Sequence, residues 1–301
     1  MARTDSGIKT SPIPDFMWEE TAPPDFLWHY TNAESVIGIV KNKAIWCTEY
    51  RYLNDKREIS TFATHLIARM REELKQLFGQ DESDRIADLV SGLYNTWNVF
   101  ICSFCVDEDR NEHWFQYAGR AGYSLGFDTR KLREIALAQG FTLGPVLYGE
   151  ERTLAIATAV LRDNLHKLST LRKPLNQDDL RNVVNFLCRL ILSYAPFFKS
   201  GSFQLEREWR LVRATGIEGD GQMEFRSKSP FGLVAYCKFN LAPRLDGEAP
   251  SKPGSNPLIP RVTIGPGNET DELTRSSHTY ELFAHNGFEI LVGETKSSLR
   301  F

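Results

Sequence analysis

A run of charged residues around one tryptophan, Glu206-Arg207-Glu208-Trp209-Arg210, constrains the fold more than any other segment. We predict a strand over Leu205 to Val212, in which side chains alternate between two faces. Glu206, Glu208 and Arg210 then share one face. Because two carboxylates and a guanidinium cannot be buried without partners, this face lines either solvent or a working cleft. The solvent alternative is an edge strand on which Arg210 neutralises Glu208.

Composition limits the class of protein. The 301 residues, 42% of them hydrophobic, suffice for one large domain or two small ones. The 36 Lys and Arg nearly balance the 39 Asp and Glu, which argues against a general nucleic-acid coat or a binder of acidic membranes. The chain has no apolar run of membrane-spanning length, and its first residues lack the apolar core of a signal peptide. We therefore expect a cytoplasmic protein with no membrane partner, and the odd number of cysteines, five, agrees.

Hydrophobic periodicity predicts a flexible tail at residues 1–24 and one mixed α+β domain at 25–301, with mostly antiparallel sheets and flanking helices. A helical region is inserted at about 150–195. Strands are predicted at 26–30, 44–48, 98–105, 122–127, 143–148, 205–213, 223–226, 231–239, 261–264 and 288–292. Helices are predicted at 33–42, from Asn54 or Asp55 to about 77, and at 83–95, 114–118, 129–139, 150–168, 177–194 and 270–285.

Two polar clusters precede predicted helices. His29-Tyr30-Thr31 ends a strand and can present imidazole and hydroxyl groups to a ligand. The alternatives are a core role for His29 and Tyr30, and a capping box between Thr31 and Glu34. The cluster of Asn54, Asp55 and Glu58 has the same two interpretations, and we favour helix capping there.

An aromatic helix and the common catalytic motifs complete the survey. Trp114 and Tyr117 are three residues apart, hence on one side of a helix, and either stack on a base or nicotinamide ring or pack in the core. The P-loop, Gly-x-Gly-x-x-Gly, His-Glu-x-x-His and Gly-x-Ser-x-Gly patterns are absent. Cys102 and Cys105 have the C-x-x-C spacing, but no second pair supplies the four ligands of zinc. We predict structural cysteines and no metal.

Taken together, these segments resemble a bacterial family of unknown function, the domain family numbered 2971. The resemblance covers about residues 26–301 and departs from the family pattern at Lys56 and Cys105. Seven elements carry it in order: His29-Tyr30-Thr31, the segment from Asn54 to Glu58, Ser103-Phe104-Cys105, Trp114 to Tyr117, Gly122 to Asp128, Glu206 to Arg210, and Ile264-Gly265-Pro266.

A weaker resemblance is to the ADP-ribosyltransferases, in which a His or Arg, then a Tyr or Ser, then a late Glu occur in this order. It implies a split sheet around a cleft, NAD as substrate, and a phage-defence or toxin-like effector. Glu208 would stabilise the cationic sugar as nicotinamide leaves, and Glu206 would position or deprotonate the acceptor, a nucleic acid or protein. The NAD-binding side chains would be His29, Tyr30, Thr31, Ser103, Tyr117 and Arg210.

Two other functions remain open from the sequence. A sensor or binding module would use the aromatic residues and Arg210 to recognise a nucleotide or partner without turnover. A metal-dependent nuclease would instead collect Asp55, Glu58, Glu206 and Glu208 around Mg²⁺. The sequence does not identify the acceptor or the oligomeric state.

Overall fold

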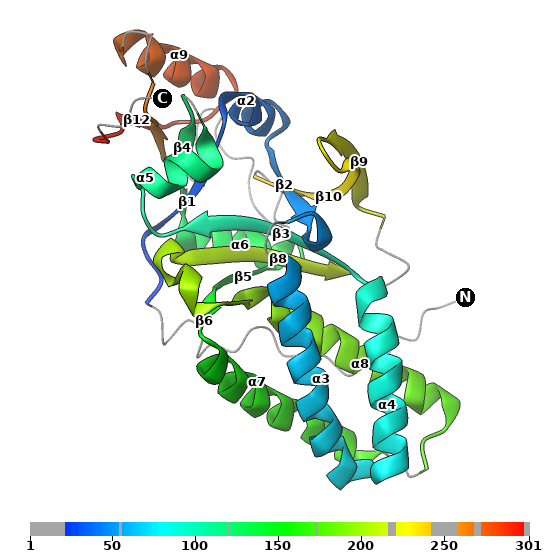
Figure 1. The fold of residues 1–301 in the computed structure, drawn as a ribbon. Coiled ribbons are helices and arrows are strands. Elements are labelled where there is room, and N and C mark those ends of the chain that lie inside the picture. Colours follow the sequence, from blue (N-terminus) through cyan, green and yellow to red (C-terminus); the bar gives the residue numbers. More distant parts are fainter. Residues whose placement is uncertain are drawn as a thin grey trace.

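A ten-stranded, mostly antiparallel sheet forms the centre of the protein, with helices on both faces (Figure 1). It is seen in a computed structural model that describes residues 22–53, 56–119, 121–171, 174–215, 221–241, 258–267 and 272–297. The predicted α+β class, with flanking helices, is confirmed. The predicted tail lies outside the described residues up to residue 21.

The elements follow the predicted order closely. The strands are β1 (Phe26–Thr31), β2 (Ala44–Glu49), β3 (Asn98–Cys105), β4 (Tyr123–Asp128), β5 (Thr142–Pro145), β6 (Leu147–Tyr148), β7 (Phe198–Lys199), β8 (Glu208–Thr215), β9 (Met223–Lys228), β10 (Gly232–Asn240), β11 (Arg261–Ile264) and β12 (Leu291–Glu294). The helices are α2 (Ala33–Asn42), α3 (Lys56–Phe78), α4 (Gln80–Leu93), α5 (Asn111–His113), α6 (Thr129–Ala138), α7 (Glu150–Leu165), α8 (Gln177–Tyr194) and α9 (Glu272–His285). Short turns of 3-10 helix and one π-helix, Trp114–Ala118, join them.

Strand β3 is where the sheet divides. One edge of β3 pairs with β8 along its whole length, from Asn98 opposite Thr215 to Cys105 opposite Glu208. The other edge is shared, because β2 pairs with it at Phe100 and Ile101 while β1 pairs only at Cys105. From there β1 continues into β4, β11 and β12, and β2 continues into β10 and β9. The sheet therefore has two wings that separate at β3.

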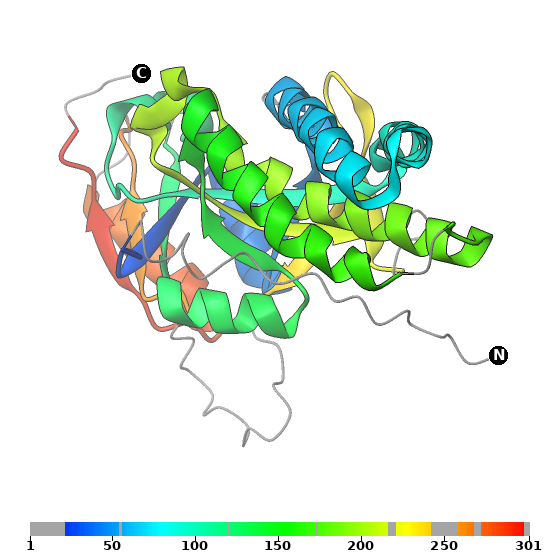
Figure 2. The same ribbon diagram turned by 90° about the horizontal axis from the view of Figure 1, so that it is seen from below.

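The two faces of the sheet have separate cores. On the first face, side chains from α3, α4, α7 and α8 pack against Ile101 of β3 and Val212 of β8. On the second face, α2, α6 and α9 cover Cys102 and Phe104 of β3 and Leu211 of β8. Figures 1 and 2 show the four helices of the first face gathered at one end of the molecule, with α6 on the opposite side of the sheet. The inserted region thus belongs to the first-face layer.

Three predicted strand boundaries are wrong for identifiable reasons. The charged strand begins at Glu208 rather than Leu205, because residues 201–206 form a 3-10 helix that ends at Arg207 in the left-handed region (φ 46°). The predicted strand 143–148 is two strands, since β5 pairs with β8 whereas β6 pairs with β7. The last strand starts at Leu291 because Phe288 first folds back onto the end of α9.

The caps also differ from the prediction at the first helix. Asn32, not Thr31, caps α2, and its side chain accepts a hydrogen bond from the amide of Ser35 (2.8 Å). Thr31 is the last residue of β1. The other predicted caps, Asn54 and Asp55, lie outside the described residues.

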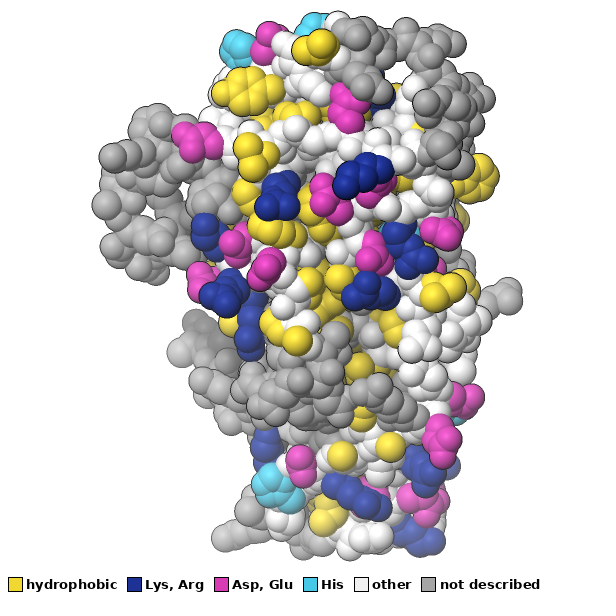
Figure 3. Space-filling model, turned by 90° about the vertical axis from the view of Figure 1, so that its left-hand side faces the viewer, with side chains coloured by type: hydrophobic (Ala, Val, Ile, Leu, Met, Phe, Trp, Pro, Cys, Tyr) yellow, Lys and Arg dark blue, Asp and Glu magenta, His cyan; other side chains and the backbone are white. Residues whose placement is uncertain are grey.

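Surface charge and hydropathy agree with the composition. Among the described residues, no helix is both long enough and apolar enough to cross a membrane. On the face that Figure 3 shows, acidic and basic side chains alternate with exposed hydrophobic ones, and the described part of that face carries no large field of one sign.

Close packing at Gly126 gives a first prediction. Gly126 of β4 lies opposite Trp28 of β1, and a Cβ there would approach the indole ring to 2.7 Å. We expect Gly126→Ala to lower the free energy of unfolding in urea by about 1–3 kcal/mol, because the buried ring must shift. Gly38→Ala is the matched control. Its Cβ in α2 would have nothing within 4 Å, so the better helix propensity should raise stability by up to about 1 kcal/mol. Equal effects at both glycines would contradict the packing argument.

Candidate functional site

A buried ion pair between Glu208 and Arg210 lies at the centre of the predicted site. The two residues share the first face of β8, as predicted, and Arg210 contacts the carboxylate twice, through Nε (2.8 Å) and Nη2 (3.0 Å). Its Nη1 donates to the carbonyl of Pro196 (2.6 Å). Glu208 is 7% exposed and Arg210 1% exposed. Neither residue is on a solvated edge strand, because β8 lies between β3 and β5.

Lys199 joins the two predicted catalytic carboxylates. Its Nζ donates to Oε2 of Glu206 (2.7 Å) and to Oε2 of Glu208 (3.1 Å). Although Glu206 is in the 3-10 turn and not in the strand, the structure still brings it to Glu208. The lysine side chain is itself buried and lies 4.9 Å from the centre of the Phe203 ring. Two carboxylates and two cations thus form one electrically balanced cluster.

Two hydroxyl groups complete the surroundings of Glu208. Ser103 of β3 is exposed, lies opposite Arg210 in the strand register, and its hydroxyl helps to lower the pKa of the Glu208 carboxyl. The Tyr148 hydroxyl accepts a hydrogen bond from the Glu208 amide (2.8 Å), and burial raises the pKa of that phenol. The structure therefore places Ser103, predicted to bind NAD, on the same face of the sheet as Glu208.

The charge state of Glu208 decides what it can do. Burial alone would raise the pKa of its carboxyl, but Arg210 and Lys199, with the Ser103 hydrogen bond, lower that pKa to about 2. Glu208 is therefore ionised at any physiological pH. Such a carboxylate is a poor proton shuttle, because general bases work best with a pKa near the operating pH. It can stabilise positive charge that develops on a nearby substrate.

His29 and Thr31 lie on the other face of the sheet. Trp28 pairs with Cys105, on the first face, so its neighbour His29 points to the second face. The Nδ1–H of His29 donates to the Ser103 carbonyl (2.9 Å), and Nδ1 is 3.7 Å from the sulfur of Cys102. Burial would lower the pKa of His29, whereas Cys102 and the Ser103 carbonyl raise it, with a net increase. His29 bridges β1 and β3 where they separate, and its side chain does not join Glu208.

The two predicted tyrosines differ in exposure. Tyr30 is 9% exposed, packs edge-on against His113 and Trp114, and its hydroxyl donates to the Asp107 carbonyl (3.1 Å). This is a core role. Tyr117 is 44% exposed, whereas Trp114 is fully buried. Trp114 and Tyr117 were expected on one side of a helix. They are not, because the segment is a π-helix, in which residues three apart lie farther around the axis than in an α-helix. An exposed ring at Tyr117 remains suited to stacking.

Sequence reasoning overlooked His113 and Lys199. His113 opens the aromatic helix, is 3% exposed, and its buried Nδ1 has no hydrogen-bond partner. Burial and the charge of Arg110 lower its pKa, and Glu208 is among the charges that act on it. A histidine directly after the charged loop 107–112 was the available signal for His113. Lys199 follows a helix, and no periodic pattern in the sequence around it predicts a role in the site.

Charged side chains connect two loops on this side of the sheet. Arg207 reaches Asp107 (2.9 Å), and Arg110 contacts both Asp107 (3.5 Å) and the carbonyl of Leu205. These contacts tie the loop after β3 to the turn before β8.

The cluster does not resemble a metal centre. Within the described ranges, no group of three or more His, Cys, Asp or Glu side chains is arranged to hold a metal ion. The ammonium of Lys199 bridges Glu206 and Glu208 where a cation shared by both would lie. Asp55 lies outside the described residues, as does the side chain of Glu58. A cavity of about 790 Å³ beside α6, lined in part by Phe26 and Arg130, shares no residue with this cluster.

Part of the chain is similar to a known protein family. Residues 113–211 match the model of the family described as protein of unknown function DUF2971. The DUF2971 segment begins at His113 and ends at Leu211, so it contains Lys199, Glu206, Glu208 and Arg210. The family resemblance predicted from the sequence is confirmed over this segment. No curated protein and no solved structure matches the chain, and the ADP-ribosyltransferase resemblance stays a prediction.

The buried pair predicts a double-mutant result. Arg210→Met leaves Glu208 buried beside Lys199 alone and should cost about 3–5 kcal/mol of unfolding free energy. The double variant Glu208→Leu with Arg210→Met removes both charges, while Lys199 and Glu206 still neutralise each other. Its loss should be smaller than that of Arg210→Met alone, as measured by urea unfolding. Additive losses would show that the two charges act independently.

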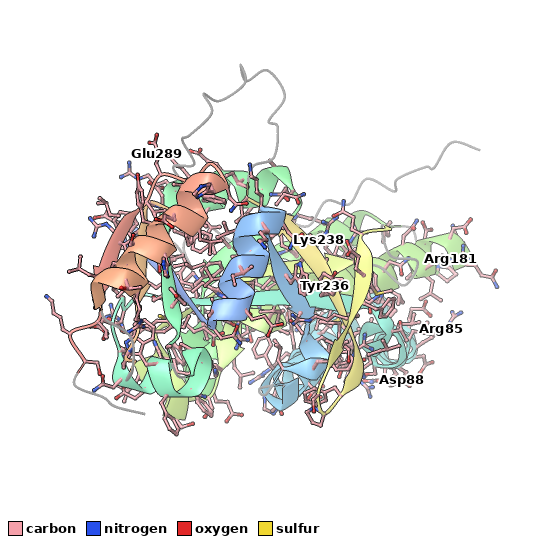
Figure 4. The ribbon with its side chains drawn as sticks, turned by 90° about the horizontal axis from the view of Figure 1, so that it is seen from above. Arg85, Asp88, Arg181, Tyr236, Lys238 and Glu289 are labelled. Carbon is pink, nitrogen blue, oxygen red and sulfur yellow. The ribbon has the colours of Figure 1, made fainter. Side chains whose placement is uncertain are left out.

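The depressed pKa of Glu208 predicts a pH dependence. A carboxyl with a lowered pKa in the folded state contributes stability above its ordinary pKa of 4.5, and this contribution is lost as the pH falls towards 2. For a pKa of about 2 the contribution at pH 7 is on the order of 3 kcal/mol. Glu208→Gln should therefore flatten the acid side of the stability curve between pH 4.5 and 2. Glu289→Gln, at an exposed residue near α9 (Figure 4), should leave that slope unchanged.

Proposed function

We propose that the protein is an NAD-dependent ADP-ribosyltransferase-like enzyme whose reaction takes place beside Glu208. The Glu208 carboxylate, paired with Arg210 and placed on the same face as the exposed Ser103, is the observation that carries this proposal. The division of the sheet at β3 also fits the split sheet that the resemblance implies. The setting of a phage-defence or toxin-like effector rests on the resemblance alone.

The chemistry would use the negative charge of Glu208. The bond between the nicotinamide nitrogen and C1′ of the ribose breaks, and nicotinamide leaves with the bonding electron pair. Positive charge then develops on the sugar, where a carboxylate with a pKa of about 2 stays ionised and stabilises it. A nucleophilic atom of a nucleic acid or protein forms the new bond to C1′ and loses its proton. Glu206, with 17% of its side chain exposed, would position that acceptor or receive the proton.

The binding roles follow from the faces of the sheet. Ser103 and Tyr117 are exposed, so the hydroxyl would bind the ribose and the ring would stack on nicotinamide. Arg210 is locked between Glu208 and Pro196 and would act by fixing the carboxylate. His29 and Thr31, on the second face, would help to hold β1 in position and would not contact NAD. His113 on the first face would take the place expected for His29.

A recognition module without turnover is the second candidate, and one observation favours it. The Glu208 carboxylate already accepts two hydrogen bonds from Arg210 and one from Lys199. A carboxylate with these contacts filled is typical of a structural group that shapes a binding surface. The nuclease hypothesis draws no comparable support, because Lys199 lies between the two carboxylates that would hold the metal.

Nicotinamide release tests the enzymatic proposal. The protein is incubated with NAD, with and without mixed DNA, RNA and protein acceptors, and release is followed by mass spectrometry. Glu208→Gln should reduce release by about 100-fold or more, because stabilisation of the cationic sugar is lost. Ser103→Ala, at an exposed position, should reduce it by about tenfold.

Controls separate chemistry from folding. Circular dichroism must show that both variants are folded, and Glu289→Gln should keep full release. If release is unaffected in a folded Glu208→Gln protein, the proposed role of Glu208 is wrong. A rise in melting temperature with NAD, without release of nicotinamide from any acceptor mixture, would instead identify the recognition module.

A further inference from the structure

The outer edge of β9 is the starting observation. Among the described residues, β9 is the terminal strand of the sheet and pairs only with β10 (Figure 1). An edge strand leaves a row of backbone amides and carbonyls that another strand can pair with. Three apolar side chains on the second face of this hairpin are exposed: Met223 by 39%, Phe225 by 60% and Leu233 by 70%. Figure 4 shows the wing from above, with Tyr236 and Lys238 labelled on β10.

We propose that β9 pairs antiparallel with β9 of a second copy of this chain, forming a two-fold symmetric dimer with a continuous sheet. The sequence of β9, Met-Glu-Phe-Arg-Ser-Lys, is complementary to itself in this orientation. With Phe225 on the two-fold axis, Glu224 of each copy lies opposite Arg226 of the other. A two-fold interface uses the same patch on both subunits, so each favourable pair occurs twice. This inference is independent of the proposed function.

Charge selects this register over its neighbours. Directly opposite residues of an antiparallel pair point to the same face of the sheet. The two-fold axis must therefore pass through a residue, and the neighbouring registers place it at Glu224 or at Arg226. An axis at Glu224 would place two carboxylates opposite each other, and an axis at Arg226 would oppose two guanidinium groups. Like charges directly opposite each other destabilise a sheet, whereas opposite charges stabilise it. Only the axis at Phe225 gives opposite charges on one face and two aromatic rings on the other.

The existing contacts of both charged residues are compatible with this pairing. Glu224 accepts hydrogen bonds from Tyr236 (2.7 Å) and Lys238 (2.8 Å), which hold its carboxylate above β10. Arg226 stacks over Trp46 and Tyr236, and its Nη2 donates to Thr48 (2.8 Å). Its Nε is buried without a partner. The stacked arginine is thus held over β10 and β2 on the first face, which is the face that Glu224 of the second copy would share.

Site-specific cross-linking tests the register. In the paired strands the two copies of residue 225 have Cβ atoms about 4.5–5.5 Å apart, so Phe225→Cys should give a covalent dimer with a short bifunctional maleimide. Leu233→Cys is the matched control, because its side chain lies on the same face and is at least as exposed. The two copies of residue 233 are separated by three strand spacings, more than about 14 Å, and should not cross-link. The native cysteines are all buried and should not react with the maleimide.

Solution mass tests the interface itself. Analytical ultracentrifugation of the full chain should show a concentration-dependent dimer, and Phe225→Lys, which places two ammonium groups at the axis, should give a folded monomer. A wild-type chain that stays monomeric at high micromolar concentration overturns the proposal. So does a dimer that survives Phe225→Lys, or cross-linking of Leu233→Cys as efficient as that of Phe225→Cys.

Discussion

The contact between Glu208 and Arg210 determines how the middle of this molecule is built. A carboxylate and a guanidinium can be buried only if nearly every donor and acceptor finds a partner. Here the partners come from separate segments: the Pro196 carbonyl, Lys199 of β7 and Ser103 of β3. The helical region, the central strand and the charged strand must therefore meet at one place. A balanced set of charges holds them there, and no large cavity is needed.

The sequence predicted most of the strands, and it offered pairing of Glu208 with Arg210 as one of two alternatives, because both depend on local periodicity. It did not predict that Leu205 and Glu206 leave the strand, because Arg207 adopts a left-handed conformation that glycine and asparagine usually mark. It also gave no signal for Lys199, whose role arises only when β7 and β8 come together. Burial of the cluster was not predicted for the same reason. Residues distant in sequence supply the hydrogen bonds that water would otherwise provide to the charged groups.

The division of site residues between two faces shows a second limit. Alternation along β1 already separates His29 from Tyr30. Which of them faces Glu208 depends on one long-range register, Trp28 opposite Cys105, followed by the pairing of β3 with β8. Order along a chain carries no information about such registers. The same registers bring His113 to the side of Glu208, although no motif marks it.

Access to Glu208 depends on which of its partners can move. Arg210 is fixed by two bonds to the carboxylate and one to a backbone carbonyl, and a planar guanidinium loses little by staying there. Lys199 instead has a flexible four-carbon chain and a second carboxylate, Glu206, within 2.7 Å. If Lys199 shifts wholly to Glu206, one acceptor position of Glu208 opens beside Ser103 and Arg210 keeps the carboxylate ionised. A ribose hydroxyl or another donor would then take the position that the ammonium had held, so the exchange of Lys199 between the two carboxylates would govern access to Glu208.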